Sequence, residues 1–236
     1  MNDALEQLLA RLVAIDSTSS LPNAPLLDAL EPRLGALGLS IERHRYRDEQ
    51  GVEKANLLAA HGSGEPELAL VGHSDCVPYD KTWREALTLT ERDGRLYGRG
   101  ACDTKAFVAC AVVALEKVKP RLNKPFLLCF TADEEVGCYG AKQLVDAKKA
   151  KSRRCIIGEP TSLTPIRGNK GYCLAELTFK GKEGHSAYPD SGASAVFRAA
   201  RFLTRLEAYS RTELRVHQDP RFTPPFTTLN TGIITG

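Results

Sequence analysis

Apolar residues recur at helical spacing in two segments near the start of the chain. In each segment they share one helical face: Leu5, Leu8, Leu9, Leu12 and Val13 in the first, and Leu26, Leu27, Leu30, Leu34 and Leu37 in the second. Gly38 follows the second segment, and glycine commonly ends a helix. The pattern therefore predicts two amphipathic helices before residue 38.

Short apolar or alternating runs then predict strands separated by helices. Strands are expected over 40–46, 56–60, 67–71, 126–131 and 155–157, a hairpin within 86–97, and helices over 103–118 and from about 140 to 149. Several of these strands are continuously apolar, which is typical of strands buried on both faces of a sheet. The alternation predicts an α/β fold with a largely parallel central sheet flanked by helices.

The pattern changes after Gly171. An alternating strand is expected over 172–179, a long amphipathic helix over 193–209 and a further strand over 227–234. We therefore expect two domains, residues 1–171 and residues 172–236, the second being the start of a smaller α+β domain. One clear helix and two strands are too few for an independent core, so the second domain is expected to be incomplete in this sequence.

Composition narrows the function classes. With 42% hydrophobic and 26% charged residues and a net charge of +3, the 236 residues are typical of a globular protein and carry no basic excess that would indicate nucleic acid. The first residues lack the features of a signal peptide, and the longest apolar stretch, 106–115, is too short to cross a bilayer. A cytoplasmic protein with no nucleic-acid or membrane partner is expected, with its seven cysteines reduced and mostly buried.

Acidic residues and one histidine follow the predicted strands at one edge of the sheet. A further acid begins the helix expected over 103–118, and together the candidates are His73, Asp75, Asp103, Glu134, Glu135 and Glu159. Because the carboxyl ends of parallel strands open into one crevice, we expect these side chains to converge. Each signal alone is weak, since an isolated Glu-Glu pair usually faces solvent; their joint placement carries the argument.

Carboxylates gathered in one crevice repel each other unless a cation compensates. Imidazole with carboxylates suits zinc, and more carboxylates than one ion needs suggest two ions with a shared ligand. Asp75 lies on the same side of an extended segment as His73 and is expected to orient it. Glu134 and Glu135 point differently, so one can bind metal while the other accepts a proton from water; spacing leaves open which.

Other chemistries fit less well. The sequence has no Gly-x-Ser-x-Gly motif and no phosphate-binding Gly-Lys-Ser/Thr loop. Cys102 and Cys138 lie near the acids, but neighbouring carboxylates raise a thiol pKa and disfavour the thiolate. Cysteine catalysis and nucleotide chemistry are therefore disfavoured.

The sequence resembles the family of acetylornithine deacetylases and succinyl-diaminopimelate desuccinylases, which are two-zinc amide hydrolases, and most closely its acetylornithine deacetylase branch. The stretches that carry the resemblance are VGHSDCVPYD, LTLTERDGRLYGRGACDTKA, TADEEVGCYGAKQL, IIGEPTSLTPIRGNKGY, GKEGHSAYPDSGASAV and TTLNTGIITG. The resemblance implies a zinc-peptidase-like catalytic domain, a dimerisation (lid) domain, a homodimer and two zinc ions per complete subunit, for which cobalt can substitute. It also implies removal of the acetyl group from N2-acetylornithine, giving ornithine and acetate, in arginine biosynthesis.

The resemblance also implies roles for single residues. His73 and Glu159 would bind one zinc, Asp103 would bridge both ions, and Glu135 would bind the second. Glu134 would be the general base and Asp75 would orient His73. His185 would reach the active site of the partner subunit and stabilise the tetrahedral oxyanion. The peptide between Asp103 and Thr104 would be cis.

Two features depart from the family pattern. Ala106 stands where the family usually has glycine, a mild change if the backbone φ is negative. The family's last histidine ligand for the second zinc lies beyond the part that this sequence matches. The alternatives left open are a related N-acyl-amino-acid deacylase, desuccinylase or dipeptidase, and an inactive remnant.

Overall fold

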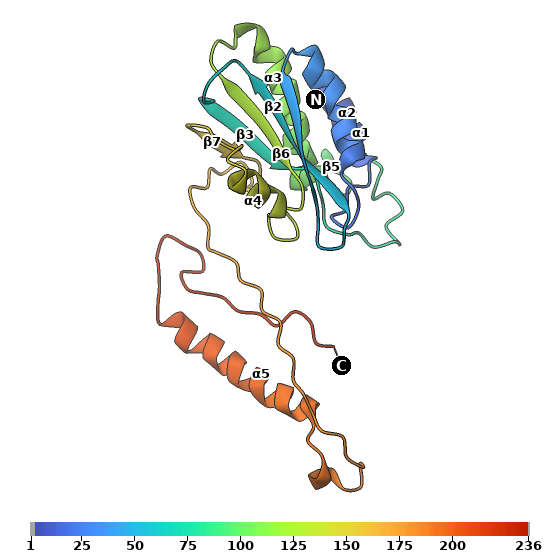
Figure 1. The fold of residues 1–236 in the computed structure, drawn as a ribbon, viewed down its shortest axis with the longest axis vertical. Helices are drawn as coiled ribbons and strands as arrows, with labels where there is room; N and C mark the ends of the chain where they lie inside the picture. Colours follow the sequence, from blue (N-terminus) through green and yellow to red (C-terminus); the bar gives the residue numbers. More distant parts are fainter. Residues whose placement is uncertain (1–2, 236) are drawn as a thin grey trace. The chain divides into compact units, whose positions relative to one another are not determined.

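The computed structural model describes residues 3–235. The chain folds as two compact units, residues 1–163 and residues 164–236 (Figure 1). The first unit holds the sheet and most of the helices. That the first unit is a catalytic domain and the second a dimerisation domain stays a prediction.

A five-stranded sheet forms the centre of the first unit, in the order β1-β2-β6-β3-β7 (Figure 1). Its strands are β1 Ser40–Arg47, β2 Glu53–His61, β3 Leu68–His73, β6 Phe126–Thr131 and β7 Cys155–Ile157. The β3–β6 and β3–β7 pairs are parallel, whereas β2 pairs antiparallel with both β1 and β6. Only β2 therefore runs against the others, which confirms the predicted largely parallel sheet.

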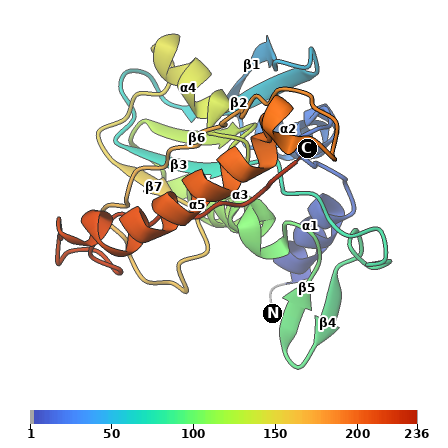
Figure 2. The ribbon, with the colours of Figure 1, turned by 90° about the horizontal axis from the view of Figure 1, so that it is seen from below.

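Helices cover both faces of this sheet. Helices α1 Asp3–Val13, α2 Ala24–Ala36 and α3 Ala106–Val118 pack with one face into the main core, and α4 Tyr139–Asp146 packs on the other face (Figure 2). Alternation within β6 shows the two faces directly, because Leu128 and Phe130 belong to the main core and Leu127 and Cys129 to the smaller one. All six residues of β6 are buried, as the continuous apolar run predicts.

The predicted hairpin is formed by β4 Thr90–Arg92 and β5 Arg95–Tyr97. Its two turn residues, Asp93 and Gly94, have φ values of 51° and 69°. Positive φ at both positions is the geometry of a type I′ turn, which matches the twist of a two-stranded hairpin. A 3₁₀ turn at Lys119–Arg121 follows α3.

The second unit contains α5 Ala195–Arg211 and two 3₁₀ turns, Pro189–Ser191 and Glu213–Arg215. Ser194 caps α5 by accepting a hydrogen bond from the backbone N–H of Phe197 (3.2 Å). The strands predicted over 172–179 and 227–234 are wrong, since the structure describes neither segment as a strand. An alternating pattern forms a strand only where a neighbouring strand takes up its backbone N–H and C=O groups, and within residues 164–235 the structure describes no such ladder.

The cysteine prediction is half right. All seven cysteines are free, but only Cys76 and Cys129 are buried, and the other five are exposed. Cys110 lies on a turn of α3 whose neighbours Ala109 and Ala111 are buried, so it occupies the outward face of an otherwise apolar helix. Among the residues that the structure describes, no helix combines the length and apolar character needed to cross a membrane.

Candidate metal centre

His73 is the last residue of β3, and its imidazole is buried between acids. Its Nδ1 donates to the backbone carbonyl oxygen of Asp75 (2.9 Å) and lies 3.5 Å from the Asp75 Oδ1, while its Nε2 lies 2.9 Å from the Asp103 Oδ1. Burial lowers the pKa of His73, but the hydrogen bond and charge of Asp75, together with Asp103, raise it to about 10. The surrounding carboxylates thus favour a positive charge at this point.

Asp103 reaches His73 from a turn at the start of α3. Residues Ala101–Lys105 form a π-helical turn, and the Asp103–Thr104 peptide is cis, as the resemblance implies. The Thr104 hydroxyl donates to the carbonyl oxygen of His73 (3.2 Å), which ties this turn to the end of β3. Ala106 has a φ of −63°, so the departure from the family's glycine costs no backbone strain.

Glu134 and Glu135 follow β6 in a loop whose backbone is hydrogen-bonded to Asp75. The Asp75 carboxylate accepts hydrogen bonds from the backbone N–H groups of Glu134 (3.1 Å) and Glu135 (3.2 Å), and from the hydroxyl of Ser19 (2.8 Å). Asp75 therefore positions both His73 and the acidic loop. The sequence predicts only its contact with His73; Ser19 lies in a Ser-Thr-Ser-Ser run that indicates nothing beyond a loop.

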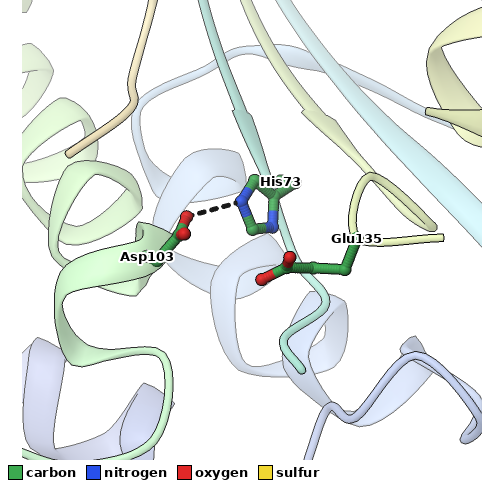
Figure 3. A group of neighbouring side chains, drawn as sticks. All are labelled: His73, Asp103 and Glu135. Atoms are coloured by element: carbon green, nitrogen blue, oxygen red, sulfur yellow. Dashed lines mark hydrogen bonds and ion pairs between the residues drawn. The ribbon is translucent and has the colours of Figure 1, made fainter. Parts of the chain in front are cut away.

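The two glutamates differ in their distance from the imidazole. His73, Asp103 and Glu135 each offer one ligand atom, and these atoms lie within 4.8 Å of one another (Figure 3). The Glu134 Oε2 lies 4.0 Å from the His73 Nε2, and its Oε1 accepts a hydrogen bond from the Cys138 thiol (3.5 Å). Glu135 thus belongs to the group that could hold an ion, and Glu134 lies beside it.

Glu159 follows β7 at the same sheet edge. The backbone N–H of Gly158 donates to the carbonyl oxygen of Val71 (2.8 Å), which keeps this segment beside β3. A Cβ at Gly158 would lie 1.9 Å from the Phe107 ring, so only glycine allows this close approach of α3. Glu159 itself is exposed and is not one of the three grouped residues.

The electrostatics of the carboxylates fit a cation. Burial raises the pKa of Glu135, and the charge of Asp103 raises it further against the opposing effect of His73. Although Glu159 is exposed overall, partial burial of its carboxylate raises its pKa, and the charges of Asp103, Glu134 and Glu135 raise it further against the opposing effect of His73. A bound divalent cation would relieve this repulsion, and one imidazole with several carboxylates is a donor set that suits zinc.

A buried lysine supports the acidic loop, and sequence reasoning misses it. Lys54 is 1% exposed; its Nζ donates to the carbonyl oxygens of Ser19 and Leu21 (2.8 Å for Leu21) and lies 3.2 Å from the Asp133 Oδ1. Tyr46 donates to the other Asp133 oxygen (2.8 Å). Lysine ordinarily faces solvent, and Lys54 lies before the strand expected over 56–60, so the sequence gives no signal for this role.

His185 belongs to the second unit and is described there by itself. It lies in an exposed loop, its Nδ1 accepts a hydrogen bond from the backbone N–H of Ala187 (3.1 Å), and its ring centroid lies 5.7 Å from that of Tyr188. The predicted reach of His185 into the active site of a partner subunit stays a prediction.

Comparisons with known proteins give consistent matches along the chain. Residues 69–229 match Peptidase family M20/M25/M40. The chain is 58% identical to an acetylornithine deacetylase of Myxococcus xanthus, over 99% of this chain and 62% of that relative. It is 37% identical to an acetylornithine deacetylase of Proteus mirabilis, over 98% of this chain and 60% of that relative. The chain therefore spans about three fifths of the length of these relatives.

Solved structures share the fold. A tripeptidase of Staphylococcus aureus superposes with a TM-score of 0.62 at 22% identity, covering 86% of this chain and 56% of that one. Human carnosine dipeptidase 1 superposes with a TM-score of 0.59 at 25% identity, covering 66% of this chain and 38% of that one. The architecture of a sheet with helices on both faces is thus shared with these peptidases.

Proposed function

The chain belongs to Peptidase family M20/M25/M40, and on that premise we propose that it acts as a metal-dependent amide hydrolase that removes the acetyl group from N2-acetylornithine. The observation that carries the proposal is the convergence of His73, Asp103 and Glu135 at one edge of the sheet. The names of the relatives from Myxococcus xanthus and Proteus mirabilis support the choice of substrate. The products would be ornithine and acetate, in keeping with a place in arginine biosynthesis.

The proposed metal ligands are His73, Asp103, Glu135 and Glu159, with zinc as the ion, two ions per complete subunit and cobalt as a possible substitute. Asp103 would be the ligand shared by both ions, because its carboxylate offers two oxygens and one of them lies 2.9 Å from the His73 Nε2. When bound, such ions supply Lewis acidity, which polarises the amide carbonyl and makes water a stronger acid.

Glu134 is the proposed general base. Its carboxylate lies next to the grouped ligands, 4.0 Å from the His73 Nε2, so it can accept a proton from water at the substrate carbonyl and deliver it to the departing amine. Asp75 keeps this carboxylate in place through the backbone of Glu134 and keeps the imidazole of His73 in place from the other side. Asp75 thereby fixes the geometry between base and ligand, through its carboxylate on the loop and through its backbone carbonyl oxygen on the imidazole.

The remaining parts of the proposal concern assembly and location. Residues 1–171 would form the catalytic part and 172–236 the start of a dimerisation domain, through which two copies associate. His185 of one copy would then donate a hydrogen bond to the oxyanion formed in the partner subunit. A cytoplasmic location agrees with a biosynthetic role.

A substrate panel tests the proposed function. The zinc-loaded protein is incubated with N2-acetylornithine, N2-succinylornithine and a dipeptide, and the release of free amine is measured. We expect release from N2-acetylornithine that stops when a chelator removes the metal and returns when zinc is restored. Release from the succinyl compound or the dipeptide instead would indicate a desuccinylase or a dipeptidase, and no release from any compound would contradict the proposal.

A further inference from the structure

A small cavity adjoins the candidate metal centre. It has a volume of about 200 Å³, and its lining includes Asp103, Glu135, Arg99, Cys76, Val77 and Cys102. The proposed metal ligands Asp103 and Glu135 therefore line the same cavity as the guanidinium of Arg99. A molecule held at the metal centre would extend one group of a few atoms into this space.

Arg99 lines the cavity and carries a hydrogen-bond donor without a partner in the described part of the chain. Its Nε is buried and has no hydrogen-bond partner among the residues that the structure describes. Its guanidinium carbon lies 5.4 Å from the centroid of the Trp83 ring, and its backbone N–H donates to the carbonyl oxygen of Ala86 (2.6 Å). The aromatic ring and the fixed backbone hold the planar cation in one orientation while leaving donors free.

A buried donor without an acceptor is unfavourable, and such groups in native proteins call for an explanation. A guanidinium beside free space is suited to a carboxylate, which it binds with two parallel N–H···O hydrogen bonds. Arg99 supplies a positive charge to the lining of this cavity, so an anionic group that enters the cavity would pair with it.

We propose that Arg99 binds the α-carboxylate of the N-acyl amino acid substrate in this cavity. The inference rests on the proposed function, because N2-acetylornithine carries a single carboxylate, two bonds from the amide nitrogen. With the amide at Asp103 and Glu135, the carboxylate enters the cavity and meets the free donors of Arg99. Arg99 is then a residue that determines specificity for N-acyl amino acids over N-acyl amines.

The test uses Trp83, which is the only tryptophan of the chain, as a reporter. Zinc-loaded protein is mixed rapidly with N2-acetylornithine or with N-acetylputrescine, which is the same molecule without the carboxylate, and the dissociation constant is read from Trp83 emission before hydrolysis. Wild-type protein is expected to bind the carboxylate compound about 10- to 100-fold more tightly, the range expected for a hydrogen bond between charged groups.

Three variants separate charge, geometry and folding. In Arg99→Gln the affinity for N2-acetylornithine falls about 10- to 100-fold and that for N-acetylputrescine stays within about threefold. Arg99→Lys keeps the charge but lacks the two parallel donors, so its affinity for N2-acetylornithine lies between those of the wild type and Arg99→Gln. Arg92→Gln, which changes an exposed arginine of the nearby hairpin, leaves both affinities unchanged.

The outcomes distinguish this subsite from the proposed function. If wild-type protein hydrolyses N2-acetylornithine but binds both compounds equally, or if Arg99→Gln weakens both to the same extent, the subsite is wrong and the proposed function stands. If no hydrolysis occurs but the carboxylate-dependent change in Trp83 emission is present and is lost in Arg99→Gln, the subsite stands and the proposed function is wrong. Equal wild-type affinities for the two compounds overturn the subsite whether or not the variants fold.

Discussion

Lys54 and Asp133 form an ion pair directly beneath the acidic loop: the Lys54 Nζ lies 3.2 Å from the Asp133 Oδ1, and the two side chains are 1% and 2% exposed. Asp133 immediately precedes Glu134 and has a φ of 55°, a left-handed conformation that few residues adopt without support. Tyr46 holds its second oxygen. The start of the loop that presents both glutamates is therefore fixed by buried polar contacts rather than by regular secondary structure.

We expect Lys54→Met to destabilise the first unit by about 3–5 kcal/mol, because it leaves the Asp133 carboxylate buried without a counter-charge. The measurement is urea unfolding followed by the emission of Trp83, which lies in that unit. Arg45→Met is the matched control: it breaks the exposed Arg45–Glu53 pair between the neighbouring strands β1 and β2, and a change below about 1 kcal/mol is expected.

The double variant Lys54→Met/Asp133→Asn checks this explanation. Removing both charges should recover part of the loss, since no unpaired charge then remains buried. A cost for Lys54→Met as small as that of Arg45→Met would show that the pair does not support the loop.

Asp75→Asn is expected to lower zinc affinity by about 10- to 100-fold, the range seen when partners of metal ligands are removed. An asparagine amide places a donor where the Ser19 hydroxyl or the Glu134 and Glu135 backbone N–H groups already donate, so the acidic loop loses its support. The negative charge 3.5 Å from the His73 Nδ1 is lost as well. Competition with a chelating dye measures the affinity. Asp80→Asn, an exposed aspartate on the following loop, is the control and should bind zinc as the wild type does. Equal affinities for all three proteins would contradict the role given to Asp75.

Much of the fold could be predicted from the sequence because the core strands are apolar runs. Strand β6 is buried throughout, β3 is buried or half-buried, and the central helix α3 is apolar on most of its faces, whereas β7 is exposed although its run is apolar. The strands predicted over 172–179 and 227–234 failed because an alternating pattern describes a surface that suits a sheet and does not supply a partner strand.

The candidate site could be predicted in part, for a different reason. His73, Asp103 and Glu135 each follow a strand or begin a helix at one sheet edge, so topology alone brings them together. Lys54, Ser19 and Asp133 were missed because their roles depend on burial and long-range contacts, and their residue types ordinarily indicate surface. The cavity at Arg99 was missed because free space leaves no periodic signal in a sequence.

Glu134→Gln and Glu135→Gln should separate the general base from the ligand. We expect Glu134→Gln to lower turnover of N2-acetylornithine by about 10²- to 10⁴-fold with unchanged metal content, because a general base moves a proton and does not coordinate. Glu135→Gln should instead lose bound metal after dialysis, since its carboxylate belongs to the ligand group. Metal content and turnover are measured on the same samples, and metal loss in Glu134→Gln alone would reverse the two assignments.

Zinc should stabilise the first unit through His73. At a free concentration of about 100 times the dissociation constant, binding to the folded state adds about 2.7 kcal/mol, which thermal unfolding followed by Trp83 emission detects. His73→Gln should abolish the shift, whereas His217→Gln, in an exposed segment of the second unit, should keep it. A shift that survives in His73→Gln but disappears in His217→Gln would place the metal elsewhere.

The most direct test of the metal centre is anomalous diffraction at the zinc absorption edge from crystals of the zinc-loaded protein. We predict a peak at the end of β3, within about 2.0–2.2 Å of the His73 Nε2 and of carboxylate oxygens of Asp103 or Glu135, with Glu134 near the ion but not bound to it. An empty map at this edge of the sheet, or a peak held by other residues such as His185 or His217, would contradict the account.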